Sequence, residues 1–234
     1  MIIATKVGMQ MAPDRVGLSP AHIRHSIDAS LKRLQTDYVD LYQSHKDDPA
    51  VPVADVLGTY ADLIKAGKVR AIGASNFTAA RLKESLDVSA ANDLPRYQSL
   101  QPHYNLLERA GYEAELEPLC RATDVGVIPY YGLAAGFLTG KYRSEQDFGQ
   151  SPRGRNMGKY LNGRGLGVLA ALDAVAAKHK ANAAQVAIAW LIARPGITAP
   201  IASATKLSQL KDLVAAAALT LDADDVTRLD KASA

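Results

Sequence analysis

The chain has 234 residues, of which 48% are hydrophobic and 22% are charged, a composition that excludes a disordered polypeptide because it supplies enough apolar side chains for a core. The 27 lysines and arginines exceed the 24 aspartates and glutamates by only three, so the charge gives no support for a nucleic acid or an anionic membrane as partner. The single cysteine, Cys120, excludes an internal disulfide and favours a reducing, cytoplasmic location.

Short apolar runs alternate along the chain with longer segments of helical periodicity, a pattern typical of parallel strands joined by crossover helices. Several of the runs are apolar throughout, as expected for strands that are covered on both faces. Six strands are predicted, at residues 2–7, 38–43, 69–73, 98–101, 126–130 and 199–202. No Gly-x-Gly-x-x-Gly string follows any of them, which favours an α/β barrel over an open dinucleotide-binding sheet. The predicted fold is a (β/α)8 barrel that is incomplete, with about six units.

Capping residues mark the ends of the helices that lie between the strands. Ser19 is a typical N-cap with Pro20 at the first helical position, and Gly67 supplies the left-handed residue after a second helix that begins near Val53. Further helices are predicted at residues 78–88, 112–123, 166–179, 183–193, 206–217 and 223–232.

Residues 143–164 interrupt this alternation, since they are rich in glycine, serine, asparagine and arginine and lack periodicity. They predict a long mobile loop, either a lid or phosphate-attracting flap, or a solvated surface excursion. No linker divides the rest, so a single domain is predicted over residues 1–234. The longest uncharged run, residues 125–140, contains Pro129 and is too short to span a bilayer, so no membrane segment is expected.

In barrels the active site gathers at the carboxyl ends of the strands, and polar side chains follow most of the predicted strands. These residues are Lys6, His45, Ser75 with Asn76, Gln101, Tyr130 and Ser203. They include neither a carboxylate pair nor a Ser-His-Asp order for hydrolysis. Asp47 and Asp48 beside His45 suggest a metal site, but Asp-Asp-Pro is a common turn opening, and no metal is predicted. Each residue also has a structural interpretation, such as helix capping by Ser75 and Asn76.

The strings around these positions resemble the aldo-keto reductase family, in the family's order and over essentially the whole chain. The matching segments are residues 3–8, 30–45, 67–77, 101–109, 131–142 and 202–205, together with Gln209. The resemblance implies a (β/α)8 barrel in which hydride passes from NADPH to the carbon of an aldehyde or ketone.

In that family a tyrosine protonates the developing alkoxide, assisted by a lysine and an aspartate, and a histidine orients the carbonyl. By position, Lys6 matches the lysine and His45 matches the histidine. An ammonium near a phenol lowers the pKa of the phenol, and a neutral imidazole N–H donates where oxygen charge develops. The resemblance thus implies catalytic roles for Lys6 and His45, with a small-molecule carbonyl compound as partner.

The resemblance also implies contacts with NADP(H). Ser75, Asn76 and Gln101 would bind the nicotinamide carboxamide, and Tyr130 would stack on the ring. The pyrophosphate would lie along Gly132, Leu133, Leu138, Gly140 and Lys141. The adenosine phosphate would lie at Ser203, Ala204, Thr205 and Lys206, with Gln209 and Asp212 reaching the adenine or ribose. Lys206 favours NADP over NAD through the 2′-phosphate, although the family more often has arginine there.

The family's aspartate and tyrosine lie upstream of the lysine strand, in an Asp-x-x-x-x-Tyr string on the first two β/α units. Met1 falls almost where the third family strand begins. The tyrosines that belong to other matched strings are Tyr38, Tyr42, Tyr60, Tyr97 and Tyr104. The sequence therefore predicts an N-terminally truncated member with impaired activity, whose first and last strands are open edges.

Two alternatives stay open on the sequence alone. A non-catalytic NADP-binding regulatory protein, similar to the potassium-channel β subunits, also fits retained cofactor strings without the acid. An aldolase that uses Lys6 as a Schiff-base amine is the other. The identity of the carbonyl substrate and the oligomeric state do not follow from the sequence.

Overall fold

The computed structural model describes residues 1–12 and 15–234, which divide into two compact units. The first unit consists of Met1–Pro102 and Glu115–Val127, and the second of His103–Ala114 and Ile128–Ala234. The single domain expected over residues 1–234 stays a prediction.

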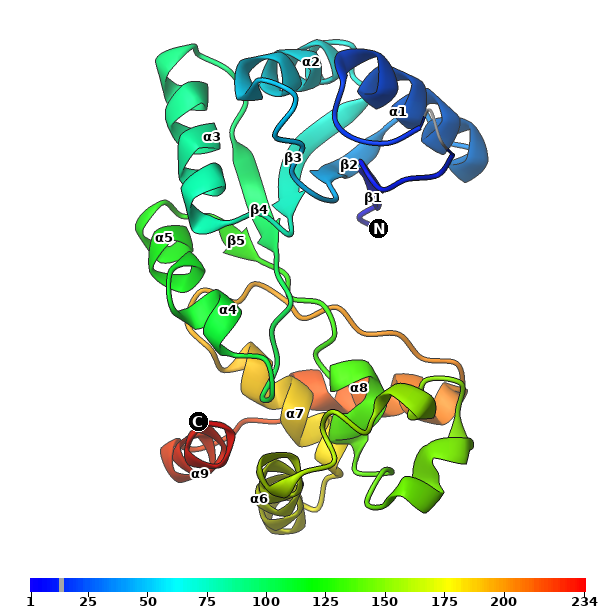
Figure 1. The fold of residues 1–234 in the computed structure, drawn as a ribbon, viewed down its shortest axis with the longest axis vertical. Coiled ribbons are helices and arrows are strands. Elements are labelled where there is room, and N and C mark those ends of the chain that lie inside the picture. Colours follow the sequence, from blue (N-terminus) through cyan, green and yellow to red (C-terminus); the bar gives the residue numbers. More distant parts are fainter. Residues whose placement is uncertain (13–14) are drawn as a thin grey trace. The chain divides into compact units, whose positions relative to one another are not determined.

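The first unit is built on a sheet of five parallel strands in the order β1-β2-β3-β4-β5 (Figure 1). The strands are β1 (Ala4–Val7), β2 (Val39–Ser44), β3 (Val69–Ser75), β4 (Tyr97–Gln101) and β5 (Gly126–Val127). Consecutive strands are neighbours, as expected when each parallel pair is joined by a crossover through a helix. The connecting helices are α1 (Pro20–Leu34), α2 (Val53–Lys65), α3 (Ala79–Ala91) and α5 (Leu116–Ala122).

The predicted start of α1 and end of α2 are confirmed, because they depend on local chemistry. The Ser19 side chain accepts a hydrogen bond from the His22 backbone N–H, and Pro20 occupies the first position of α1. Gly67 adopts φ +73° after α2. The capping interpretation of Ser75 and Asn76 is wrong, because the N-cap of α3 is Thr78, whose side chain accepts from the Arg81 backbone N–H.

A cluster of aromatic rings joins the sheet to its helices. Tyr60 of α2 and Tyr97 of β4 are fully buried, and Ser44 Oγ lies 2.8 Å from the first hydroxyl and 2.9 Å from the second. Burial raises the pKa of both phenols, so they stay protonated. This shared serine links strands β2 and β4 to helix α2.

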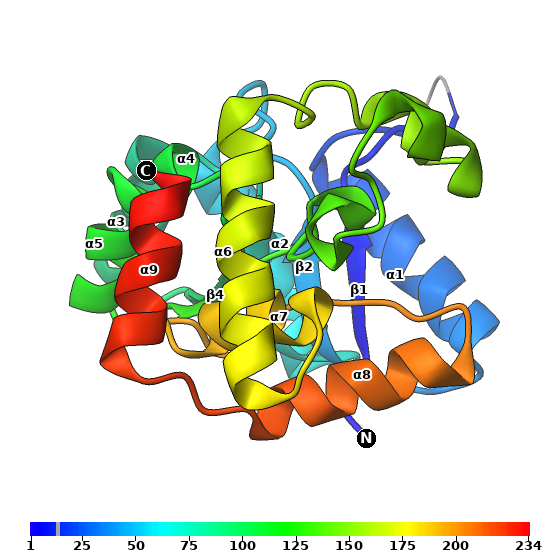
Figure 2. The same ribbon diagram turned by 90° about the horizontal axis from the view of Figure 1, so that it is seen from below.

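The second unit is mainly helical. Its helices are α4 (Ala110–Glu113), α6 (Gly163–His179), α7 (Ala183–Ile192), α8 (Leu207–Ala218) and α9 (Ala223–Ser233), with 3-10 helices η1 (Ala134–Thr139), η2 (Glu145–Gln150) and η3 (Gly154–Asn156). α6 and α9 lie side by side, and α7 packs against both α6 and α8 (Figure 2). α7 is apolar almost throughout and nearly all of it is buried, so it forms the core of this unit.

The structure differs from the predicted elements in three places. Residues 199–202 form no strand: Ile201 N–H donates to the Pro129 carbonyl, but a strand needs a ladder of such bonds, and the sixth predicted strand is wrong. The fifth is shorter than predicted, since Pro129 has no N–H to donate. The helix predicted at 112–123 breaks into α4 and α5 around Ala114, because the Pro118 ring would clash with the carbonyl four residues earlier.

The segment predicted as a loop at residues 143–164 contains η2 and η3, and α6 begins within it at Gly163. Its tyrosine and methionine side chains, Tyr160 and Met157, are buried. Among the residues that the structure describes, no helix combines the length and apolarity needed to cross a bilayer.

Candidate active site

Five of the predicted site residues lie at the carboxyl ends of the first four strands. They are Lys6, His45, Ser75, Asn76 and Gln101. Parallel neighbouring strands end at one edge of their sheet, so the fold brings these side chains together in the first unit.

Lys6 lies near the carboxyl end of β1, and His45 follows the neighbouring strand β2 at this edge. Lys6 is in register with Gln43, and the His45 backbone N–H donates to the Val7 carbonyl at 2.7 Å. Partial burial lowers the pKa of Lys6. Burial, and then the charge of Lys6, lowers the pKa of His45, so its imidazole is neutral at pH 7. The arrangement places a neutral hydrogen-bond donor beside a cation.

Hydrogen bonds between side chains and backbone join the ends of β2, β3 and β4. Asn76 Nδ2 donates to the His45 carbonyl at 2.9 Å and to Ser75 Oγ at 3.1 Å. Ser75 Oγ in turn donates to the Gln101 carbonyl at 2.9 Å. Asn76 adopts φ +56°, a left-handed conformation that asparagine tolerates. The three predicted carboxamide-binding residues therefore belong to one hydrogen-bonded set.

Asp47 and Asp48, which suggested a metal site in the sequence, instead hold the loops around His45 through hydrogen bonds. Asp47 Oδ1 accepts from Arg81 Nε of α3 at 2.8 Å, and Arg81 also donates to the Val51 carbonyl. Asp48 Oδ2 accepts from the Leu18 backbone N–H at 2.8 Å, which joins the loop after β1 to the loop after β2. Within residues 1–12 and 15–234, no group of three or more histidine, cysteine or acidic side chains is placed to hold a metal ion.

A buried polar row continues from Lys6 across the sheet. Gln43, Gly73 and Ser99 are in register on β2, β3 and β4, so their side-chain positions share one face. A Cβ on Gly73 would collide with Ser99 Oγ and lie 3.2 Å from Gln43 Cγ. Gln43 Nε2 and Ser99 Oγ are buried without a hydrogen-bond partner in the described part of the chain. Sequence reasoning missed this row, which only the strand register reveals.

The predicted pyrophosphate segment lies in the second unit and has an unusual backbone. Its left-handed residues are Tyr131 (φ +56°), Ala134 (+47°), Ala135 (+56°), Gly136 (+106°) and Gly140 (+78°). Backbone that alternates between right- and left-handed conformations turns N–H groups toward a common point, which is how proteins form anion-binding concavities. Gly132 lets this segment approach α7, because a Cβ there would lie 2.8 Å from Leu191 Cδ1.

The predicted adenosine-phosphate residues precede and begin α8 in the same unit. Ser203, Ala204, Thr205 and Lys206 are exposed, and Lys206 is the N-cap residue. Gln209 Oε1 accepts from Thr205 at its backbone N–H (2.8 Å) and its hydroxyl (3.1 Å). Asp212 instead accepts from Gln185 of α7 at 3.1 Å. A helix N-terminus with a lysine is favourable for a phosphate.

The full chain, residues 1–234, matches the sequence pattern described as the aldo/keto reductase family. The chain belongs to that family. Its α/β fold class, with the parallel sheet of a (β/α)8-type barrel, confirms the predicted class, and the sheet described in this aldo/keto reductase has five strands.

Named relatives agree with this assignment. An aldo-keto reductase of Fusarium vanettenii is 32% identical over 217 residues, which cover 92% of this chain and 58% of that protein. Probable aldo-keto reductase 1 of Glycine max is 30% identical over 240 residues, covering 98% and 66%. The aldo-keto reductase YhdN of Bacillus subtilis is 33% identical over 231 residues, covering 96% and 68%. The chain thus spans roughly three fifths to two thirds of the length of these relatives.

Proposed function

We propose that this aldo/keto reductase chain binds NADP(H) and serves the reduction of aldehydes or ketones to alcohols by hydride transfer. The observation that carries the proposal is the set at the ends of β1–β4. There a neutral His45 lies beside the Lys6 cation, and Asn76 and Ser75 link the His45 and Gln101 backbones. We further propose that residues 1–234 act as one barrel domain in the cytoplasm, with a small carbonyl compound as partner.

The residues present fit the chemistry of the proposed cofactor. A carboxamide needs a donor and an acceptor side by side, which the hydroxyl of Ser75 and the amides of Asn76 and Gln101 provide. The left-handed backbone of residues 131–140, with Lys141 next to it, fits a pyrophosphate. Lys206 at the N-cap of α8 favours a 2′-phosphate, and hence NADP over NAD.

The chain's own residues would act on the carbonyl oxygen. When bound, NADPH supplies the hydride to the carbonyl carbon. His45, kept neutral by burial and by Lys6, would donate its N–H to the carbonyl oxygen and orient it. The Lys6 ammonium would stabilise the negative charge that develops there and favour the ionised form of a neighbouring acid.

The matched strings do not supply a proton donor for the developing alkoxide. Four tyrosines of the matched strings are fully buried, and burial raises the pKa of each; they are Tyr42, Tyr60, Tyr97 and Tyr104. A phenol that is sealed in a core cannot reach a substrate oxygen. We propose accordingly that the 234-residue chain binds the cofactor with impaired turnover, and binding without any turnover would favour the regulatory alternative.

A titration of the purified chain with NADPH and NADH, followed by cofactor fluorescence, tests the proposal. The chain should bind NADPH more tightly than NADH, and K206A should reduce that preference, while K180A, at the end of α6, should not. Reduction of 4-nitrobenzaldehyde is measured alongside. Absence of NADPH binding by the folded chain would overturn the proposal.

A further inference from the structure

Two aromatic side chains of the second unit, His103 and Tyr131, pack against Tyr130. The His103 ring stacks on the Tyr130 ring with centroids 5.2 Å apart and planes inclined by 14°. Tyr131 meets both rings edge-on, at 5.4 Å from His103 and 5.2 Å from Tyr130. A parallel stack covers one face of a ring, so His103 covers one face of Tyr130 and leaves its stacking on any ligand to the opposite face.

The backbone holds the same pair of residues in register. His103 and Tyr130 form an isolated parallel bridge, with the Tyr104 N–H donating to the Tyr130 carbonyl at 3.5 Å. The two side chains therefore start from neighbouring backbone positions. Their stacking follows from the pairing of two segments that are distant in sequence.

Asn105 fixes both segments from inside the unit. Its side chain is fully buried, and Oδ1 accepts from the Leu107 N–H at 2.8 Å. Nδ2 donates to the Tyr131 carbonyl at 2.9 Å and lies 3.4 Å from His103 Nε2. Tyr131 has φ +56°, which is strained for an aromatic residue and persists only where its surroundings impose it. The Asn105 amide supplies one such restraint.

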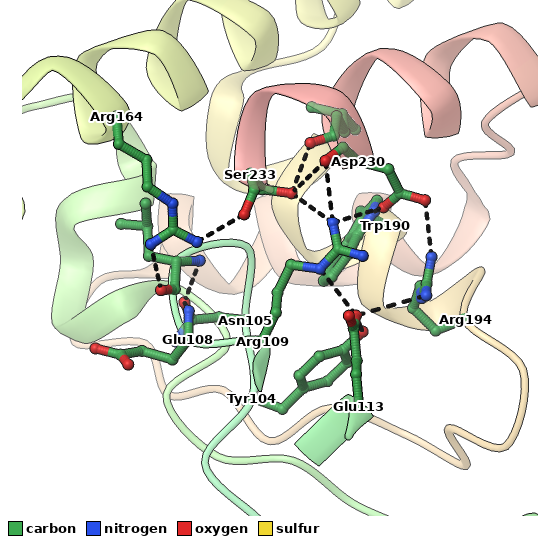
Figure 3. Close-up of polar contacts among 12 residues, drawn as sticks. Tyr104, Asn105, Glu108, Arg109, Glu113, Arg164, Trp190, Arg194, Asp230 and Ser233 are labelled. Carbon is green, nitrogen blue, oxygen red and sulfur yellow. Dashed lines mark hydrogen bonds and ion pairs between the residues drawn. The ribbon is translucent and has the colours of Figure 1, made fainter. Parts of the chain in front are cut away.

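The loop that carries His103 and Asn105 is itself anchored to α9, the C-terminal helix (Figure 3). Arg109 donates to Ser233 Oγ at 2.8 Å and to the Asp230 carbonyl at 3.1 Å. Arg164 donates to the Leu107 carbonyl at 3.1 Å and to the Ser233 carbonyl at 2.6 Å. Two arginines therefore connect the loop behind Tyr130 to the C-terminal helix.

We propose that His103 and Asn105 are positioning residues for Tyr130. His103 sets the plane of the Tyr130 ring, and Asn105 holds the Tyr131 turn from which that ring projects. The inference rests on the proposed function, in which the face of Tyr130 turned away from His103 stacks on the nicotinamide. A ring whose plane is fixed beforehand loses less conformational freedom on binding, so the support strengthens cofactor binding without touching the cofactor.

The test measures NADPH affinity and the environment of Tyr130 in the whole chain. H103A removes the stacked ring, H103F restores an aromatic ring without imidazole chemistry, and H25A on the exposed surface of α1 is the matched control. We expect H103A to raise the dissociation constant of NADPH about five-fold, from the usual worth of one aromatic pair. H103F should stay within about two-fold of the original chain, as should H25A.

Fluorotyrosine labelling gives a readout without the cofactor. The ¹⁹F resonance of Tyr130 is assigned by its disappearance in Y130F. It should shift in H103A, because the ring current of His103 is lost, and it should keep a ring-current shift in H103F, which retains an aromatic ring at this position. N105D keeps the acceptor for Leu107 but removes the donor to the Tyr131 carbonyl, and it should broaden the same resonance. N92D, at an exposed asparagine after α3, should not.

The possible results distinguish a failure of the proposed function from a failure of the positioning roles. If the original chain does not bind NADPH, the proposed function fails, and the resonance of Tyr130 alone decides the positioning. Equal NADPH affinity of H103A and the original chain, or an unmoved Tyr130 resonance, overturns the positioning roles. The positioning roles are also overturned if H103F binds NADPH as poorly as H103A although its urea unfolding midpoint shows that it is folded.

Discussion

Asp225 at the start of α9 is expected to stabilise the second unit through its charge. It is 3% exposed, its Oδ2 lies 2.6 Å from His179 Nε2, and its Oδ1 accepts from Lys178 Nζ at 2.9 Å. Burial alone would raise the pKa of Asp225, but these hydrogen bonds outweigh it and lower the pKa from 3.8 to about 2. The perturbation is D225N, which keeps the shape and removes the charge.

The magnitude follows from the two pKa values. A carboxyl group whose pKa is lower in the folded state stabilises that state at pH values above its unfolded pKa, here near 4. At 1.36 kcal/mol for each pKa unit, the shift corresponds to about 2 kcal/mol at pH 7. This contribution decreases as the pH falls from about 4 and is lost as the pH passes through about 2.

Urea unfolding followed by circular dichroism measures this difference. D225N should lower the free energy of unfolding by about 2 kcal/mol at pH 7, and the gap between the two proteins should narrow at pH 3. D224N is the control, since Asp224 is exposed in the same helical turn and should change stability by only a few tenths of a kcal/mol. An equal loss for both variants, or a gap that does not change with pH, would refute the reasoning.

Two further predictions concern the first unit. G73A should lower the free energy of unfolding by about 1–3 kcal/mol, because the new methyl group collides with Ser99 Oγ. G58A in α2 has open space around the new methyl group and should instead raise the free energy of unfolding by up to about 1 kcal/mol. Urea unfolding measures both changes, and equal effects would contradict the register of the polar row. K6M should raise the pKa of His45, because the charge of Lys6 is one of the two causes that lower this pKa. Burial, the other cause, should still keep the pKa of His45 below 6.5. NMR titration measures the pKa, and an unchanged value would show that Lys6 does not act on His45.

Elements whose ends depend on neighbouring residues could be predicted from the sequence. Ser19 with Pro20, and Gly67, mark helix ends through their own backbone chemistry, and the structure has them there. The break before α5 follows from Pro118 by the same kind of reasoning, although the helical pattern at 112–123 concealed it. Residues 199–202 read Ala-Pro-Ile-Ala, in which only Ile201 favours a strand, and strand formation also depends on partners that are far away in the chain.

The candidate site also has a part that could be predicted from the sequence and a part that could not. Residues at strand ends were predictable, because parallel strands bring their carboxyl ends to one edge and the matched strings label them. The contacts of Arg81 with the His45 loop, and of His103 with Tyr130, could not be predicted. They depend on the register of separate segments, and no local pattern in the sequence encodes it.

The serine shared by two buried phenols also makes the core tolerant of losing either one. The hydroxyls of Ser44, Tyr60 and Tyr97 carry three protons and share two hydrogen bonds, so one proton is left over within this set whichever group donates. Removing either phenol leaves Ser44 bonded to the other, and the remaining pair can exchange donor and acceptor. Y60F and Y97F should therefore each cost one buried hydrogen bond, about 1 kcal/mol, without leaving an additional proton unpaired.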